Sequence, residues 1–250
     1  MPAGLLELAG KTALITGAAK RMGRATARAL AGAGVHCVLH YRSSAEACAA
    51  VAADVCAAGG NAWMVQGDFA DPSAAARTFD KAKEAAGTID ILVNNASVFP
   101  DSTLMNCEPE DVHHNLNVNT LTPFLLAREL AAQERDAVVV NFLDAMIADY
   151  DRKHVAYHLS KRALYSLTRM MAVEFAPRLR VNAVAPGLVL PPAGKDESYL
   201  ASLAHTNPLE TCGSLETITE AVLFLVRNSF ITGQVIYVDG GRNLRGAMYG

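Results

Sequence analysis

The sequence predicts an α/β fold, a single doubly wound domain over residues 1–250 in which helices flank a seven-stranded parallel sheet. Two observations predict this class. Short apolar runs alternate along the chain with longer alanine-rich segments, which is the rhythm of strand–helix–strand units. The runs are also apolar on both faces, as strands of a parallel sheet must be when helices cover both sides.

The elements follow in order along the chain. Strands are expected at Thr12–Thr16, Val35–Tyr41, Ala62–Gln66, Ile89–Asn94, Ala137–Phe142, Arg180–Ala185 and Gln234–Val238. Helices are expected between them, at about residues 23–33, 44–58, 73–86, 108–133, 155–176 and 215–227. In such a sheet, ligands bind beyond the carboxyl ends of the strands. The long segment at about 187–208 has no clear periodicity, and we expect it to form a substrate loop that begins with Leu188.

Composition excludes several classes of function. The chain has 22 basic and 25 acidic residues, a net charge of −3, which argues against a nucleic-acid partner bound through a basic surface. No apolar run approaches the length of a membrane span, and the first residues lack the pattern of a secretory signal. The five cysteines form no CxxC pair, so neither a disulfide framework nor a metal site is expected. We therefore expect a cytoplasmic protein.

The turn after the first strand has the character of a nucleotide site. Gly17 permits a tight turn, and Gly23 lets the following helix begin close to a bound phosphate, with Lys20, Arg21 and Met22 between them. The free N–H groups of a helix N-terminus attract a pyrophosphate. The alternative is a glycine-containing turn without a ligand, because Arg21 occupies the position that is often Gly.

The end of the second strand indicates which nucleotide binds. It reads His40-Tyr41-Arg42-Ser43, where an NAD site usually has an acidic residue that accepts from the ribose 2′-hydroxyl. A guanidinium beside a hydroxyl suits a 2′-phosphate instead, which favours NADP(H). The alternative is a solvated arginine next to a helix-capping serine.

Further cofactor contacts are expected after the next two strands. Asp68, followed by Phe69, can accept from the adenine amino group, and Asn95, Ala96 and Ser97 would lie along the adenosine.

Tyr157 and Lys161 are four residues apart in AYHLSK, on one face of a predicted helix. A nearby ammonium group stabilises a phenolate, so we expect Lys161 to lower the pKa of Tyr157 and prepare it as a proton donor. The pair alone is common, and its alternative is an exposed helix pair.

Taken together, the motifs resemble those of short-chain dehydrogenases/reductases. They are TGAAKRMG, NNAS, VNT around Asn119, AYHLSK, APG at 185–187 and VDGG at 238–241, spread over almost the whole chain. The resemblance implies a Rossmann-type domain, usually in a homotetramer or a dimer. It also implies that Tyr157 is the acid, that Lys161 tunes it and holds the nicotinamide ribose, and that Asn119 supports a water–lysine proton path. Pro186 and Gly187 would line the nicotinamide end.

One position departs from the family pattern. The serine usually found thirteen residues before the tyrosine is Asp144 here, and a carboxylate cannot donate a hydrogen bond to a substrate carbonyl. Together with Arg21, Ser97 and Phe99, Asp144 makes the chain similar to pteridine reductases. The DRKHVAYHLSK and DGGRNLRG stretches are similar to bacterial dihydromonapterin reductases.

The resemblance to this branch implies how a pterin substrate would bind. Phe99 can stack on the flat ring, and Arg21 and Ser97 can bond its polar edge. Asp144 can join Tyr157 in a proton relay to a ring nitrogen.

The expected function is therefore NADPH-dependent reduction of a dihydropterin, such as dihydromonapterin, dihydrobiopterin or a folate, by hydride transfer with Tyr157 as the proton donor. Two alternatives remain open: a carbonyl or 3-oxoacyl thioester reductase, and a protein that senses NADP(H) without catalysis.

Overall fold

The computed structural model describes residues 4–149, 152–192 and 194–244. Its centre is a seven-stranded sheet, all parallel, in the order β3-β2-β1-β4-β5-β6-β7. The strands are β1 Thr12–Ile15, β2 His36–Tyr41, β3 Ala62–Gln66, β4 Ile91–Asn94, β5 Ala137–Phe142, β6 Leu179–Pro186 and β7 Val235–Val238. The seven expected strands are confirmed, with ends that differ by at most two residues.

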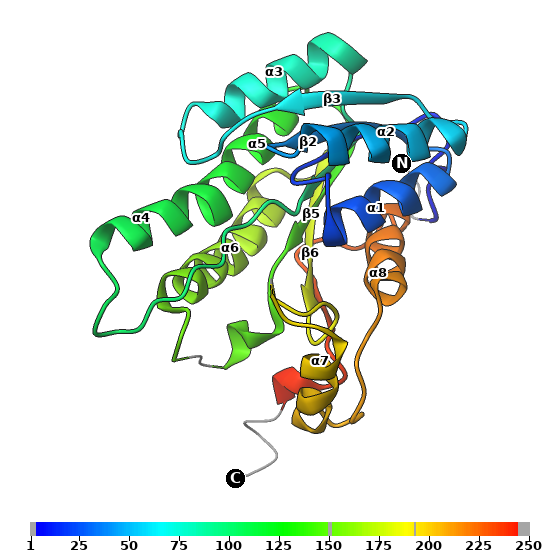
Figure 1. The fold of residues 1–250 in the computed structure, drawn as a ribbon. Helices are drawn as coiled ribbons and strands as arrows, with labels where there is room; N and C mark the ends of the chain where they lie inside the picture. Colours follow the sequence, from blue (N-terminus) through cyan, green and yellow to red (C-terminus); the bar gives the residue numbers. More distant parts are fainter. Residues whose placement is uncertain (1–3, 150–151, 193, 245–250) are drawn as a thin grey trace.

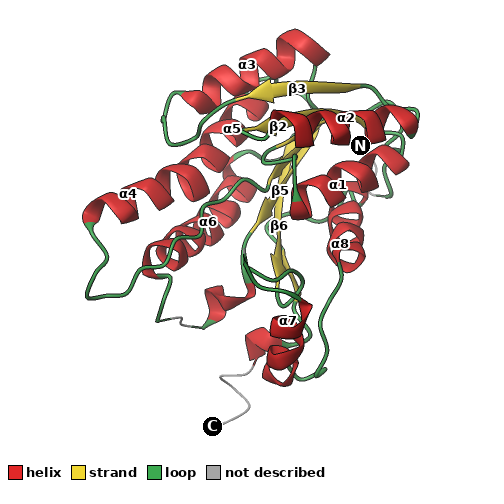
Figure 2. Cartoon of the chain, viewed as in Figure 1, coloured by secondary structure: helices red, strands yellow, loops and turns green. Residues whose placement is uncertain are grey.

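Helices cover both faces of the sheet. They are α1 Arg21–Gly32, α2 Ala45–Ala57, α3 Ala74–Ala86, α4 Pro109–Leu116, α5 Thr122–Ala131, α6 Val155–Glu174, α7 Glu197–Leu203 and α8 Leu215–Arg227. In Figure 1, α4 and α6 lie to the left of the sheet, and α1 and α8 lie to its right. Figure 2, coloured by secondary structure, shows the strands enclosed between these helices.

The core is divided by the sheet into two layers. Successive residues of β1 face opposite sides: Ala13 and Ile15 pack with α1, α2 and α8, whereas Leu14 packs with α3, α5 and α6. All three side chains are fully buried. The two-sided apolarity of the strands is thus explained by a helical layer on each face.

Two expected elements differ from the structure. The single helix expected over 108–133 contains a wide π-turn, Asn117–Leu121, between α4 and α5. Pro123 has no N–H to donate to the carbonyl four residues earlier, and the N–H of Thr122 bonds to Asn117 O instead. The segment 187–208, expected to be a loop, includes the short helix α7, whose N-cap is Asp196.

Three further short helices complete the described chain: η2 Ala145–Ala148, η3 Ala204–Thr206 and η4 Arg242–Leu244. Among the described residues, no helix is both long and apolar enough to cross a membrane.

Candidate active site

The turn between β1 and α1 is built from closely packed backbone. Gly17 has a φ of +63°, and a side-chain carbon added at Gly23 would lie 2.2 Å from the carbonyl oxygen of Gly17. Asn95 Nδ2 donates to Gly17 O at 3.1 Å and to Thr16 O at 2.9 Å. The small size of Gly23 is thus required by Gly17 and Asn95. Gly23 does not itself line the cavity beside the turn, and its expected closeness to a bound phosphate stays a prediction.

The first turn of α1 is open to an anion. Its N-cap residue, Lys20, makes no capping hydrogen bond with its side chain, and the first turn holds no acidic residue. The positive end of the helix dipole therefore faces the cavities that Lys20 and Arg21 line. Arg21 adopts a φ of +53°, and its guanidinium donates to Pro191 O at 2.8 Å, which joins this turn to the segment before α7.

Beyond β2 and β3, a cavity of about 240 Å³ suits an adenosine phosphate. Arg42 and Ser43 line it and are exposed, and the Arg42 guanidinium makes no ion pair or hydrogen bond with another described residue. Asp68 lies across the cavity and uses one oxygen to accept from the N–H of Ala70. A free guanidinium with a neighbouring hydroxyl fits the 2′-phosphate that distinguishes NADP(H).

His40 supports this cavity from inside the sheet. Its ring stacks on Phe69 with centroids 4.1 Å apart, Nδ1 accepts from the N–H of Gly17 at 3.2 Å, and Nε2 lies 3.1 Å from Gly67 O. Burial lowers the pKa of His40 to about 4, so the ring is neutral near pH 7. Neutral His40 can accept from Gly17 and donate to Gly67 at the same time, which fixes the turn.

A second cavity, of about 510 Å³, adjoins the first and is lined by Asp144 and Tyr157. Tyr157, in the first turn of α6, donates its hydroxyl hydrogen to Asp144 Oδ2 at 2.9 Å. Asp144 Oδ1 accepts from the N–H of Met146, which caps the short helix η2. The buried Lys161 Nζ donates to Phe142 O at 2.7 Å and lies 5.7 Å from the centroid of the Tyr157 ring.

The pKa of Tyr157 corrects one expectation. Burial first, and then the charge and hydrogen bond of Asp144, raise the pKa of Tyr157 well above its ordinary value. Burial lowers the pKa of Lys161 to about 8, although Asp144 opposes that shift. The expected lowering of the Tyr157 pKa by Lys161 is therefore wrong for this state, because burial and then the direct contact with Asp144 raise it. Tyr157 keeps its proton until a substrate accepts it.

Asn119 lies in the π-turn and is fully buried. Its Oδ1 accepts from the N–H of Val98 at 2.9 Å and from Ser97 Oγ at 3.1 Å. Its Nδ2 donates to Val98 O and Ser160 Oγ, both at 3.0 Å. Asn119 thus fastens the residues after β4 to α6, and its expected contribution to a proton path stays a prediction.

Phe99 follows this anchored stretch and forms one wall of the second cavity. Its ring is 49% exposed and meets Tyr157 edge-on, with centroids 4.5 Å apart, and His154 in the same manner at 3.9 Å. A half-exposed aromatic ring beside the Tyr157 ring can receive a flat ring.

Most of the residues expected from the sequence come together around these two cavities. Those that line one or both are Gly17, Lys20, Arg21, Met22, His40, Tyr41, Arg42, Ser43, Asp68, Phe69, Asn95, Ala96, Ser97, Phe99, Asp144, Tyr157, Pro186, Gly187 and Leu188. Lys161, Asn119 and Gly23 lie behind the lining. The segment expected as a substrate loop, about 187–208, contributes Leu190, Pro192, Tyr199, Leu200 and Leu203 to the lining, although these residues were not singled out. Sequence reasoning missed Met146 and Arg242.

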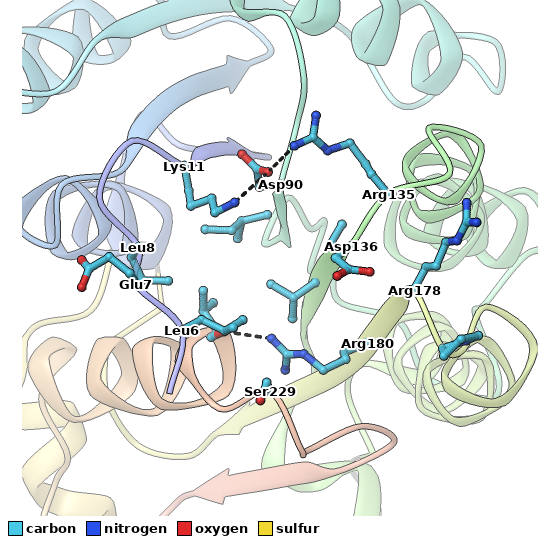
Figure 3. Close-up of a pocket in the computed structure, with 15 residues that line it drawn as sticks. Leu6, Glu7, Leu8, Lys11, Asp90, Arg135, Asp136, Arg178, Arg180 and Ser229 are labelled. Atoms are coloured by element: carbon cyan, nitrogen blue, oxygen red, sulfur yellow. Dashed lines mark hydrogen bonds and ion pairs between the residues drawn. The ribbon is translucent and has the colours of Figure 1, made fainter. Parts of the chain in front are cut away.

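A larger cavity, of about 650 Å³, lies at the opposite edge of the sheet, beside the amino ends of β4 and β5. Figure 3 shows Asp90 between Lys11 and Arg135, with nitrogen–oxygen distances of 3.6 and 3.4 Å. Arg180 donates to Leu225 O, Val226 O and Ile231 O at 2.8–3.2 Å. These charged groups bond within the protein and hold strand starts and helix ends together, so the cavity has a structural explanation.

The cofactor site fits NADP(H) on its donor groups. The uncapped start of α1 offers N–H groups to a pyrophosphate, and unpaired Arg42 offers a cation to a 2′-phosphate. The two cavities share Gly17, Lys20, Ala96 and Ser97, so one extended molecule can occupy both and end beside Tyr157.

Known proteins are similar to this chain over nearly its whole length. A family model described as enoyl-(acyl carrier protein) reductase matches residues 17–243. A short-chain type dehydrogenase/reductase of Picea abies is 32% identical over 94% of this chain and 93% of its own length. A 3-oxoacyl-[acyl-carrier-protein] reductase of Synechocystis sp. is 30% identical over 95% of this chain and 98% of its own.

The fold comparison agrees. A crystal structure of FolM alternative dihydrofolate reductase 1 from Brucella canis, complexed with NADP, matches with a TM-score of 0.90 and 32% identity, over 95% of this chain and 96% of that one. Other similar structures also contain NADP or NADPH. With a family model that spans most of the sequence, relatives at least 30% identical over nearly all of it, and similar structures that contain NADP or NADPH, the chain belongs to the short-chain dehydrogenase/reductase family and is an NADP(H)-dependent oxidoreductase.

Proposed function

We propose that the protein reduces a pterin, converting a dihydropterin to the tetrahydro form at the expense of NADPH. The observation that carries the proposal is the hydrogen bond from the Tyr157 hydroxyl to Asp144, at the position where the family usually has a serine. A serine would donate to a ketone oxygen, whereas Asp144 can only accept when it is ionised.

The chemistry of a C=N bond suits this pair. NADPH supplies a hydride to the ring carbon, and a proton must reach the ring nitrogen. Burial and Asp144 raise the pKa of Tyr157, so the tyrosine carries this proton at neutral pH. As the nitrogen accepts the proton it gains positive charge, which the adjacent carboxylate of Asp144 stabilises. The same carboxylate would repel the negative charge that develops on a ketone oxygen.

Phe99 supports a flat substrate. Its half-exposed ring stands edge-on to Tyr157, so a planar heterocycle lying against Phe99 would be near the tyrosine hydroxyl. Ser97 and Arg21 line the same cavity and can bond the polar edge of a pterin. The printed name of the Brucella canis structure, an alternative dihydrofolate reductase, supports the same substrate class.

A carbonyl or 3-oxoacyl thioester reductase is the second candidate, because the Synechocystis relative carries that name. The two candidates differ at Asp144. The assay mixes the purified protein and NADPH with one substrate at a time: dihydrobiopterin, dihydrofolate, a simple ketone or an acetoacetyl thioester. Turnover is measured as the loss of NADPH absorbance.

We expect the parent protein to reduce a pterin. Asp144→Ser should lower pterin turnover and raise ketone turnover, because it restores a donor; Asp144→Asn, which keeps the shape and removes the charge, separates charge from geometry. Good reduction of ketones or thioesters with no reaction of any pterin would refute the proposal.

A further inference from the structure

The outer end of the substrate cavity holds a cation that the proposed chemistry does not use. Arg242, in the short helix η4, lines this end together with Tyr199 and Leu203 of α7 and Met146 of η2. Figure 1 shows η4 beside α7, below the carboxyl ends of β5 and β6. Helix η4 also packs against η2, the turn that directly follows Asp144. Arg242 therefore belongs to the substrate side of the cavity, farther out than Tyr157.

Arg242 has no counter-ion among the described residues. The acid nearest in sequence is Asp239, and both of its carboxylate oxygens are occupied: Oδ1 accepts from the N–H of Gly241 at 2.9 Å and Oδ2 from the N–H of Asn243 at 2.6 Å. These bonds, with the bond from the N–H of Arg242 to Asp239 O, shape the turn that presents Arg242. The guanidinium itself makes no hydrogen bond or ion pair with a described side chain.

The rest of the described lining offers Arg242 no bonded acidic partner. Asp144 is the one acidic side chain in the described lining, and its two oxygens are bound to Tyr157 and to the N–H of Met146. The Arg21 guanidinium, at the cofactor end, already donates to Pro191 O. Lys195 does not line the cavity: its Nζ lies 5.7 Å from the centroid of the Tyr199 ring, and it is followed by the acidic residues Asp196 and Glu197. Arg242 is thus a cation that lines the cavity without a bonded partner among the described residues.

We propose that Arg242 is a specificity-determining residue that binds an anionic group, a carboxylate or a phosphate, on the side chain of the substrate. The proposal rests on the proposed function, because it assumes that the reducible ring lies against Phe99 and Tyr157 and directs its substituent outwards. A guanidinium binds either anion through paired hydrogen bonds, and apolar Leu203 and the Tyr199 ring would flank the connecting segment.

The test compares three substrates that share a ring and differ in the charge of the tail: dihydrofolate with carboxylates, dihydroneopterin phosphate, and uncharged dihydrobiopterin. The variants are Arg242→Gln and Arg242→Lys, with Arg169→Gln as the matched control, since exposed Arg169 lines neither cavity. We expect Arg242→Gln to raise KM for at least one of the two anionic substrates by roughly tenfold, with kcat and the KM for dihydrobiopterin unchanged.

Three further readouts sharpen the result. Arg242→Lys should recover part of the loss, and added salt should raise the parent's KM for the anionic substrates only. The affected substrate tells carboxylate from phosphate recognition. An equal change in KM for charged and uncharged substrates, or no change for any, would overturn the proposal. So would weaker NADPH binding in Arg242→Gln, measured by fluorescence, because it would assign Arg242 to the cofactor.

Failure of the proposed function gives a different pattern. If no pterin reacts and a carbonyl compound does, the pterin assignment is wrong. The role of Arg242 is then tested by measuring KM for a 3-oxo carboxylate and for its uncharged ester in the parent and in the same variants. A rise in KM for the carboxylate alone supports anion recognition, and an equal rise for both substrates refutes it.

Discussion

Replacing Arg42 by Asp tests the basis of the cofactor preference. The Arg42 guanidinium is exposed, lines the adenosine cavity and has no partner among the described residues, so it is available for a 2′-phosphate. In Arg42→Asp the phosphate loses this contact and meets a negative charge. The new carboxylate can instead accept from the 2′-hydroxyl of NADH.

The size of the effect follows from the contact. A hydrogen bond to a charged group contributes about 1.5–3 kcal/mol, and about 1.4 kcal/mol corresponds to a factor of ten. The efficiency with NADPH should thus fall about 10- to 100-fold, toward the lower figure because solvent screens an exposed charge. A new neutral-donor bond to the ribose adds about 0.5–1.5 kcal/mol for NADH, or about two- to tenfold.

The assay is the ratio of kcat/KM for NADPH to that for NADH, measured at low and at high salt. Arg169→Asp, with the same change of charge away from both cavities, is the control. We expect the ratio to collapse in Arg42→Asp and to stay at the parent value in the control, and the parent's preference to weaken as salt is added. A ratio that survives the substitution, or a parent preference that salt does not affect, would contradict the reasoning.

The remaining predictions concern the proton donor, its helix and the turn beside it. Tyr157→Phe removes the hydroxyl but no expected cofactor anchor, so turnover should fall about 10²- to 10⁴-fold while NADPH binding, followed by fluorescence, stays near the parent value; a near-parent rate would exclude Tyr157 as the acid. Ser102 accepts from the N–H groups of Val155 and Ala156 through its carbonyl and hydroxyl oxygens and so caps α6 from a distant segment. Ser102→Ala should lose about 1 kcal/mol of stability and also lower kcat. The control Ser214→Ala, which removes the cap of α8, should lose similar stability with kcat unchanged. Equal kcat values in the two variants would refute a role for Ser102 in holding Tyr157. The pKa of His40 falls from 6.5 to about 4 on folding. Between these pH values the unfolded chain therefore binds more protons than the folded protein. The stability that His40 contributes is complete above pH 6.5 and is lost as pH falls toward 4. Urea unfolding at several pH values should show a loss of about 3 kcal/mol over this window, and His40→Asn should flatten the slope; an unchanged slope would show that other groups control it.

The sheet could be predicted from the sequence because each strand is a short run that must be apolar on both faces. Apolar periodicity correctly indicated helical structure over 108–133, but it could not reveal the π-turn at Asn117–Leu121. That turn depends on the missing N–H of Pro123 and on the contacts of buried Asn119 with Val98 and Ser160, which lie far apart in sequence. Helix α7 is too short to show a period, although the capping residue Asp196 was a usable local signal.

Residues of the candidate site could be predicted where the type of residue alone indicates what it can bind. Arg42 in place of an acid indicated a phosphate, and Asp144 in place of a hydroxyl indicated an acceptor. The pKa of Tyr157 was not predictable in the same way. Spacing along the helix suggested Lys161 as the controlling neighbour, whereas the fold buries Tyr157 and puts Asp144 in contact with its hydroxyl. Arg242 was missed because only the packing of η4 against η2 brings it to the cavity.

The two walls of the substrate cavity are held in place by different contacts, and this affects which residues can be varied without loss of activity. Residues 97–102 are bonded to Asn119 at one end and to the start of α6 at the other. We expect substitutions that disturb this wall to disturb Tyr157 as well. The opposite wall, around α7, is joined to the cofactor turn through the bond from Arg21 to Pro191. We therefore expect a mutant library for altered selectivity to retain activity more often when it varies residues in and around α7 than when it varies residues 97–102.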